Sequence, residues 1–242
     1  MPKVPGLGGA PQGGNNATYI GIDSMLKYNG YLYMANNGGI RYSSNFTTNF
    51  NSNSVLSTPS AQSGTTLWLP GLEKVSPGLK GVPILFEYNG RLYMARNVTS
   101  GTPDNYDRLR GELWKCNPGT SGGALTCEPG DWTRIITGEE SDLTASAISL
   151  LQENGSGRLY VGFDHASGVS VWRIESANPS ATTGTMTSAG WEQQGSLGLV
   201  GGHIKIYSSA SISDGTYDYI YLTAGDDAQS IRVYRQREEA MP

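Results

Sequence analysis

Few side chains in this sequence could do acid–base or metal chemistry. The chain has two histidines, His165 and His203, and Asp164 directly precedes the first of them. Asp226 and Asp227 form a second acidic pair further along the chain. Imidazole and carboxylate groups brought to one place could bind a metal ion or pass a proton between an acid and a base. The alternative, that these are ordinary polar loop residues, stays open.

Two further groups of residues suggest binding. Arg96 and Asn97 begin a segment that continues to residue 110. Residues 98–109 within it form the longest loop that the sequence predicts, and long loops often carry contacts. Residues 104–107 and 214–218 carry Asp and Asn oxygens at the short spacing of calcium loops. The same residues also favour turns. We therefore predict no cofactor, with calcium as an alternative, and assign no catalytic residue.

The elements that would position these residues follow from an internal repeat. A phrase of the form Gly-x-Leu-Tyr-Met recurs around the aliphatic positions Leu32, Leu92, Leu159 and Ile220, at spacings of 60, 67 and 61 residues. Each copy follows an apolar stretch, at residues 19–26, 82–86, 145–151 and 204–210. A short turn with Asn or Gly between two such stretches predicts a β-hairpin.

Two more strands complete each repeat. An aromatic residue beside a basic one marks the third strand, at residues 41–42, 114–115, 172–173 and 234–235. A tryptophan opens the fourth strand, at Trp68, Trp132 and Trp191, and the last copy has none. Each repeat is thus a four-stranded antiparallel sheet with an apolar inner strand. We expect Trp114, Trp132 and Trp172 to be buried between sheets.

A single sheet of this kind cannot cover its own faces, and radial stacking of several sheets does so. The sequence therefore predicts an all-β fold, a β-propeller of about four four-stranded antiparallel blades. It forms one domain over residues 1–242, with blades near 19–72, 79–137, 144–197 and 203–236. Residues 4–7 echo residues 69–72, so residues 1–8 could close the last blade. The alternative is that further blades of a parent chain complete a larger propeller.

In a propeller, the loops between second and third strands share one face with the loops that join successive blades. Loops of the first type carry Arg96, Asn97, Asp164, His165, Asp226 and Asp227 to this loop face, and a loop of the second type carries His203 to it. The two imidazoles would then lie in adjacent blades.

Cys116 and Cys127 flank a Gly-rich loop between the third and fourth strands of the second blade. We predict a disulfide across these strands, which implies an oxidising compartment. Two free thiols on neighbouring strands are the alternative.

The segments 157–162, 169–173 and 190–192 read Gly-Arg-Leu-Tyr-Val-Gly, Val-Ser-Val-Trp-Arg and Gly-Trp-Glu. This pattern resembles the repeats of kelch-like β-propellers and extends over all four copies. The resemblance implies a propeller that binds partners, since only a minority of that family are enzymes.

Composition limits the function further. The net charge is −4 and no basic stripe is present, so nucleic acid is not an expected partner. No apolar run reaches the ~18 residues of a membrane span, and residues 1–6 lack the apolar core of a signal peptide. We predict an extracellular or cell-surface binding or adhesion module, non-catalytic, whose loop face holds a protein or a carbohydrate. The alternatives are a hydrolase or lyase with a His/Asp loop-face site, and a structural segment of a larger surface protein.

Overall fold

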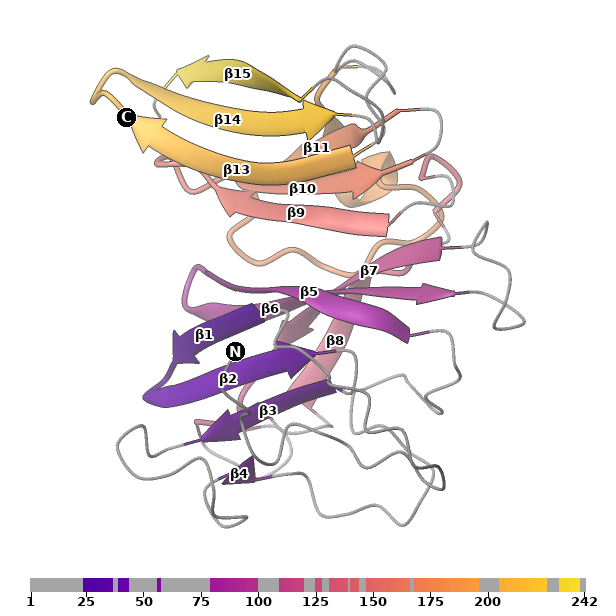
Figure 1. Ribbon diagram of the computed structural model, residues 1–242, viewed down its shortest axis with the longest axis vertical. Coiled ribbons are helices and arrows are strands. Elements are labelled where there is room, and N and C mark those ends of the chain that lie inside the picture. The colour runs from indigo at the N-terminus through magenta and orange to yellow at the C-terminus, as the bar shows by residue number, and fades with distance from the viewer. Residues whose placement is uncertain are drawn as a thin grey trace.

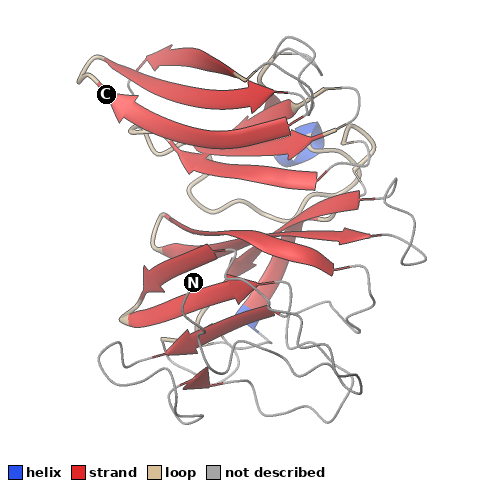
Figure 2. Cartoon of the chain, viewed as in Figure 1, coloured by secondary structure: helices blue, strands red, loops and turns tan. Residues whose placement is uncertain are grey.

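The described part of the protein consists almost entirely of β-strands and turns (Figure 2). The computed structural model describes residues 24–36, 39–43, 56–57, 79–99, 109–119, 125–127, 131–138, 140–143, 147–165, 168–195, 205–225 and 231–239. A short 3-10 helix, η3 (Thr187–Ala189), lies among these residues. None of the described residues forms a helix with the length and hydropathy needed to cross a lipid bilayer.

The strands form four antiparallel sheets that follow one another along the chain. The first sheet contains β1 (Ser24–Tyr28), β2 (Tyr31–Asn36), β3 (Gly39–Ser43) and β4 (Leu56–Ser57). The second contains β5 (Leu79–Tyr88), β6 (Arg91–Thr99), β7 (Leu109–Cys116) and β8 (Trp132–Ile136). The third contains β9 (Ala147–Glu153), β10 (Leu159–Asp164), β11 (Ser170–Ile174) and β12 (Glu192–Gln193), and the fourth contains β13 (Lys205–Ser213), β14 (Tyr217–Gly225) and β15 (Arg232–Glu239).

The arrangement of the sheets is that of a β-propeller (Figure 1). Within each sheet the strands lie side by side in chain order. The first strands contact one another in sequence, β1 with β5, β5 with β9, and β9 with β13. The sheets thus stack face to face about a common inner edge, and the predicted all-β propeller fold is confirmed.

The first two hairpins turn through residues with positive φ. Asn29 and Gly30 have φ of 47° and 82°, and Asn89 and Gly90 have φ of 46° and 68°. Two consecutive left-handed residues are typical of type I′ turns, whose twist matches that of the flanking strands. The Asn-Gly pairs in the sequence therefore specify these turns, as predicted.

The same hairpins also tie each sheet to the next. The Tyr28 hydroxyl donates to the Gly90 carbonyl (3.1 Å), and the Tyr88 hydroxyl donates to the Gly157 carbonyl (2.7 Å). Beside them, the side-chain amide of Asn29 donates to Leu125 O (3.3 Å). The amide of Asn89 makes the corresponding bond to Ala177 O (3.0 Å). Each Tyr-Asn-Gly turn therefore contacts the hairpin and an outer loop of the following sheet.

Three apolar clusters fill the spaces between successive sheets. The cluster between the first and second sheets includes Tyr33, Leu92 and Trp114, and the cluster between the second and third includes Tyr93 and Trp172. Trp114, Trp132 and Trp172 are 5%, 7% and 2% exposed, so their predicted burial is confirmed. Large rings fill the space between sheets, as expected for a propeller.

The fourth sheet has three strands among the described residues, as the missing tryptophan strand of the last copy leads one to expect. The first three sheets have four, although β4 and β12 are only two residues long. Residues 1–8, which could complete the last blade, lie outside the described residues. Ring closure therefore stays a prediction.

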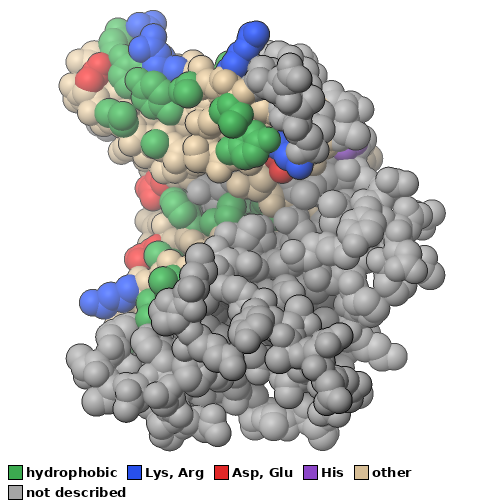
Figure 3. Space-filling model, in the orientation of Figure 1, with side chains coloured by type: hydrophobic (Ala, Val, Ile, Leu, Met, Phe, Trp, Pro, Cys, Tyr) green, Lys and Arg blue, Asp and Glu red, His purple; other side chains and the backbone are tan. Residues whose placement is uncertain are grey.

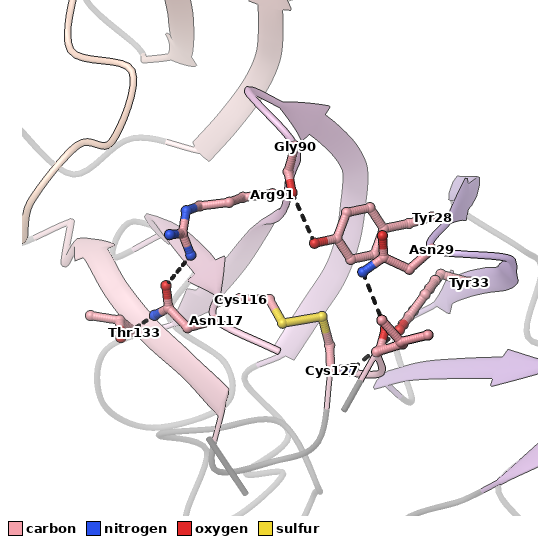
Figure 4. Close-up of a disulfide and its surroundings, with 10 residues drawn as sticks. Tyr28, Asn29, Tyr33, Gly90, Arg91, Cys116, Asn117, Cys127 and Thr133 are labelled. Carbon is pink, nitrogen blue, oxygen red and sulfur yellow. Dashed lines mark hydrogen bonds between the residues drawn. A yellow bond between two sulfur atoms is a disulfide. The ribbon is translucent and has the colours of Figure 1, made fainter. Parts of the chain in front are cut away.

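Cys116 and Cys127 form the expected disulfide, with a Cα–Cα distance of 5.9 Å. The prediction placed the bridge between the third and fourth strands, but Cys127 lies in the segment that precedes β8, and Cys116 is paired with Trp132. The bridge therefore holds the connecting segment against β7. In Figure 4 this segment reaches the first sheet, where Cys127 N donates to the Tyr33 hydroxyl (3.1 Å).

Candidate functional site

The predicted loop-face residues are only partly within the described structure. Asp164 ends β10, and His165 follows it. Arg96 and Asn97 are strand residues of β6, paired with Glu112 and Gly111, because β6 extends to residue 99 before the loop begins. His203, Asp226 and Asp227 lie outside the described residues, so their approach to His165 remains a prediction.

The carboxylate of Asp164 links three strands of two sheets. Its Oδ1 accepts hydrogen bonds from Ser149 Oγ (2.7 Å) on β9 and from the backbone N–H of Ile206 (2.8 Å) on β13. Burial raises the pKa of this carboxyl, and the bonds from Ser149 and Ile206 lower it by a smaller amount. A half-buried acid with a raised pKa is suited to hold a proton, and it also anchors the start of β13 to the third sheet.

His165 lies in a turn at the end of β10. Its carbonyl accepts a hydrogen bond from Gly168 N (2.9 Å), which reverses the chain toward β11. Within the described part of the chain, no group of three His, Cys, Asp or Glu residues could hold a metal ion. Asp164 and His165 are therefore neighbouring polar residues at the end of β10. The described residues around them do not provide a set of metal ligands.

The second calcium candidate is a turn in the structure. Asp214 Oδ1 accepts hydrogen bonds from the backbone N–H groups of Thr216 (2.9 Å) and Tyr217 (2.8 Å), and Oδ2 accepts from the Tyr219 hydroxyl (3.0 Å). These bonds, Tyr217 first, hold the pKa of this carboxyl below its usual range. This is the geometry of an Asx turn, in which the side chain stabilises the β13–β14 hairpin. Residues 104–107 lie outside the described residues.

A cavity of about 420 Å³ lies between the third and fourth sheets. Its lining comes from β10, β11 and the residues next to β11 and β12 on one side, and from β14 and β15 on the other: Tyr160, Val169, Val171, Gln194, Ile220, Leu222, Tyr234, Arg235, Gln236 and Arg237. The floor is apolar and buried, since Tyr160 and Val169 are each 1% exposed. Cavities of several hundred Å³ with an apolar floor and a few polar groups are typical of small-ligand sites.

The polar groups at the mouth of the cavity are two glutamines, one from each sheet. Gln236 Nε2 donates to Gln194 Oε1 at 2.7 Å, so the pair bridges the third and fourth sheets. Arg235 and Arg237 also line the cavity, but their guanidinium groups lie 5.3 Å from the ring centre of Tyr219 and 4.4 Å from that of Tyr217. Their guanidinium groups thus stack on rings of β14, and the two glutamine amides are the polar groups that join the two sides of the cavity.

This cavity was not predicted from the sequence. Tyr160 and Tyr234 occupy repeated positions, and they are, respectively, a buried member and a partly buried neighbour of the apolar cluster between the third and fourth sheets. Gln194 and Gln236 belong to no repeated position. One difference among the copies was visible in the sequence: the fourth copy lacks the tryptophan strand that the other three have.

The chain resembles several solved structures at low identity. An α-L-arabinanase from Cellvibrio cellulosa is 12% identical with a TM-score of 0.45, over 90% of this chain and 70% of that one. An endo-arabinase from Bacteroides thetaiotaomicron is 12% identical with a TM-score of 0.41, over 88% and 73%. An α-L-arabinofuranosidase from Lactobacillus brevis is 8% identical with a TM-score of 0.30, over 88% of both chains.

No protein-family model and no curated protein matches the sequence. The kelch-like pattern of the repeats is therefore a resemblance in sequence alone. Because the identities and TM-scores of the solved structures are low, no residue of this chain takes a role from them.

Proposed function

We propose that the protein binds a neutral carbohydrate in the cavity between the third and fourth sheets. The observation that carries this proposal is the combination of a tyrosine- and aliphatic-lined floor with the Gln194–Gln236 pair at the mouth. The C–H face of a sugar ring packs on apolar and aromatic side chains, while amides donate to and accept from its hydroxyl groups. The guanidinium groups of Arg235 and Arg237 lie over tyrosine rings on the side of the fourth sheet that points away from the third sheet, so their charges are directed away from the cavity, which favours a neutral sugar over an acidic one.

Isothermal titration calorimetry with neutral oligosaccharides of arabinose, xylose, glucose and galactose tests this proposal. Gln236→Ala should weaken binding about tenfold, because a lost hydrogen bond with a partner left unsatisfied costs about 1.4 kcal/mol. Gln193→Ala is the matched control, since this exposed glutamine of β12 does not line the cavity. Equal losses in the two variants, or no binding of any of these sugars by the wild type, would contradict a sugar site in the cavity.

A second candidate function is hydrolysis of a carbohydrate, with Asp164 as a general acid. One observation favours it: burial raises the pKa of Asp164 at the end of β10, and His165 follows it on the same loop face. A general acid must be protonated at working pH before it gives its proton to the leaving oxygen. Asp164→Asn keeps an oxygen that can accept from Ser149 and Ile206, so the variant should stay folded and bind sugar but release no reducing ends. Equal hydrolysis by both proteins would remove Asp164 from this role.

We further infer an oxidising location, such as the outside of the cell, and the Cys116–Cys127 disulfide supports it. Both cysteines are buried, so thiol titration in denaturant of protein purified without reductant from its native source should detect no free thiol. Two reactive thiols per chain would argue for a reducing compartment. Adhesion to a protein partner, and a role as a segment of a larger surface protein, stay predictions.

A further inference from the structure

The two sides of the fourth sheet have different environments. Along β14, the side chains of Ile220 and Leu222 point toward the third sheet and are buried, whereas Tyr219 and Tyr221 point the other way and are only half-buried. We call this outer side the forward face, and it comprises Ile212, Tyr219, Tyr221, Val233, Arg235 and Arg237. Ile212 is 57% exposed and Val233 is 68% exposed. Figure 3 shows hydrophobic side chains gathered over this part of the molecule, with Lys and Arg side chains at its upper rim.

The repeat identifies what kind of surface the forward face is. Tyr221 occupies the position of Tyr33, Tyr93 and Tyr160 in the other three copies. Those three tyrosines are 0%, 0% and 1% exposed, and each lies in the cluster between its own sheet and the next. The forward face is therefore the same surface that the first three sheets bury against a following sheet.

The first sheet has the complementary surface uncovered. Met25 and Lys27 are paired with Met34 and Leu32, and they lie on the side of the sheet opposite Tyr33. We call this side the rear face and define it by Met25, Lys27 and Leu32. Met25 is 57% exposed and Lys27 is also exposed, whereas Leu92 and Leu159, the equivalents of Leu32 in later copies, are fully buried against the preceding sheet.

We propose that the forward face of one copy of this chain docks onto the rear face of a second copy. The contact would continue the series of sheet-on-sheet interfaces that the chain already makes three times. Its residues suit the purpose, since tyrosine and arginine are the side chains most enriched at the energetic centres of interfaces. The two surfaces differ, so the association is head-to-tail, and it closes into a ring or extends according to the rotation between copies.

Three equally exposed apolar side chains allow a matched test. Ile212 lies on the forward face, Met25 lies on the rear face and Leu125 lies on neither, and each is 57% exposed. Ile212→Lys, Met25→Lys and Leu125→Lys are compared with the wild type by sedimentation velocity from about 1 µM to 1 mM, the range of weak to moderate affinities. Circular dichroism and melting curves confirm that each variant is folded.

The wild type and Leu125→Lys should exceed the monomer mass of 25.9 kDa as concentration rises, and the other two variants should remain monomeric. An equimolar mixture of Ile212→Lys and Met25→Lys should then form a dimer, because one chain keeps its rear face and the other its forward face. A monomeric wild type at all concentrations would overturn the proposal, and so would association of either face variant alone. Failure of the mixture to associate would also overturn the proposal. In a symmetric interface each chain contributes the same surface, so a substitution that disrupts it in both chains would not be rescued by mixing.

Discussion

Removal of the disulfide should destabilise the protein by about 3 kcal/mol. The bridge joins residues that are 11 apart in sequence. Closing a loop of this size in the unfolded chain accounts for about 3 kcal/mol on the chain-entropy model. The variant is Cys116→Ala with Cys127→Ala, because both cysteines are buried and alanine introduces no new polar group.

The effect should also reach the first sheet. The segment that ends at Cys127 supplies one acceptor and one donor to that sheet. Leu125 O accepts from the Asn29 amide, and Cys127 N donates to the Tyr33 hydroxyl. If the bridge holds this segment in place, Tyr33→Phe should cost about 1 kcal/mol in the wild type and less in the double-alanine variant. This non-additivity distinguishes a positional effect from a purely entropic one.

Urea unfolding followed by tryptophan fluorescence measures both effects. Wild-type protein in reductant should unfold at the same midpoint as the double-alanine variant, and the variant itself should not respond to reductant. A loss below about 1 kcal/mol would refute the loop-closure argument, because constraint of the unfolded chain would then contribute little. Full additivity of Tyr33→Phe would refute the coupling to the first sheet.

Three other changes test the packing and the electrostatics. Trp132→Ala should cost about 3–5 kcal/mol in urea melts, since a buried indole between two sheets is lost, and a cost under about 1 kcal/mol would place this ring outside the core. Gly111→Ala should cost about 1–3 kcal/mol, because the new Cβ would lie 2.5 Å from the backbone N of Ile148; an unchanged melting temperature would contradict this close approach of β7 to β9. Burial raises the pKa of Asp142, but bonds from the backbone N–H groups of Met186 and Thr187 outweigh it and leave the pKa below its usual value. The stability from Asp142 is therefore present above its unfolded pKa, near 4, and is lost as pH falls through the lower folded value; Asp142→Asn should be less acid-sensitive than the wild type in melts from about pH 6 to pH 2.

The repeated phrases carried most of the information about the fold. Hairpin turns, strand order and the burial of three tryptophans follow from local patterns, because Asn-Gly turns and period-two alternation are short-range features. The start of β8 at Trp132 was predicted correctly, yet Cys127 was assigned to that strand although it lies five residues before it. The bridge reaches the connecting segment, whose path no local pattern reveals.

The candidate site was much harder to predict. The cavity depends on Gln194 and Gln236, which are 42 residues apart and meet only because the third and fourth sheets stack. Asp164 was selected for its chemistry, yet its bond to the Ile206 N–H is a contact between sheets that no local pattern reveals. A site between two repeats depends on residues that differ among the copies. A repeat pattern in the sequence shows only the residues that the copies share.

The tyrosine–asparagine turns bear on how such a chain changes its number of repeats. Tyr28 and Asn29 donate to Gly90 O and Leu125 O of the second sheet, and Tyr88 and Asn89 carry the same donors. Tandem duplication of the second repeat would present those donors to a new copy of the acceptors that the first repeat already uses. The gene could thus gain a blade with its turn contacts ready-made, and evolution would only have to adjust the curvature of the ring.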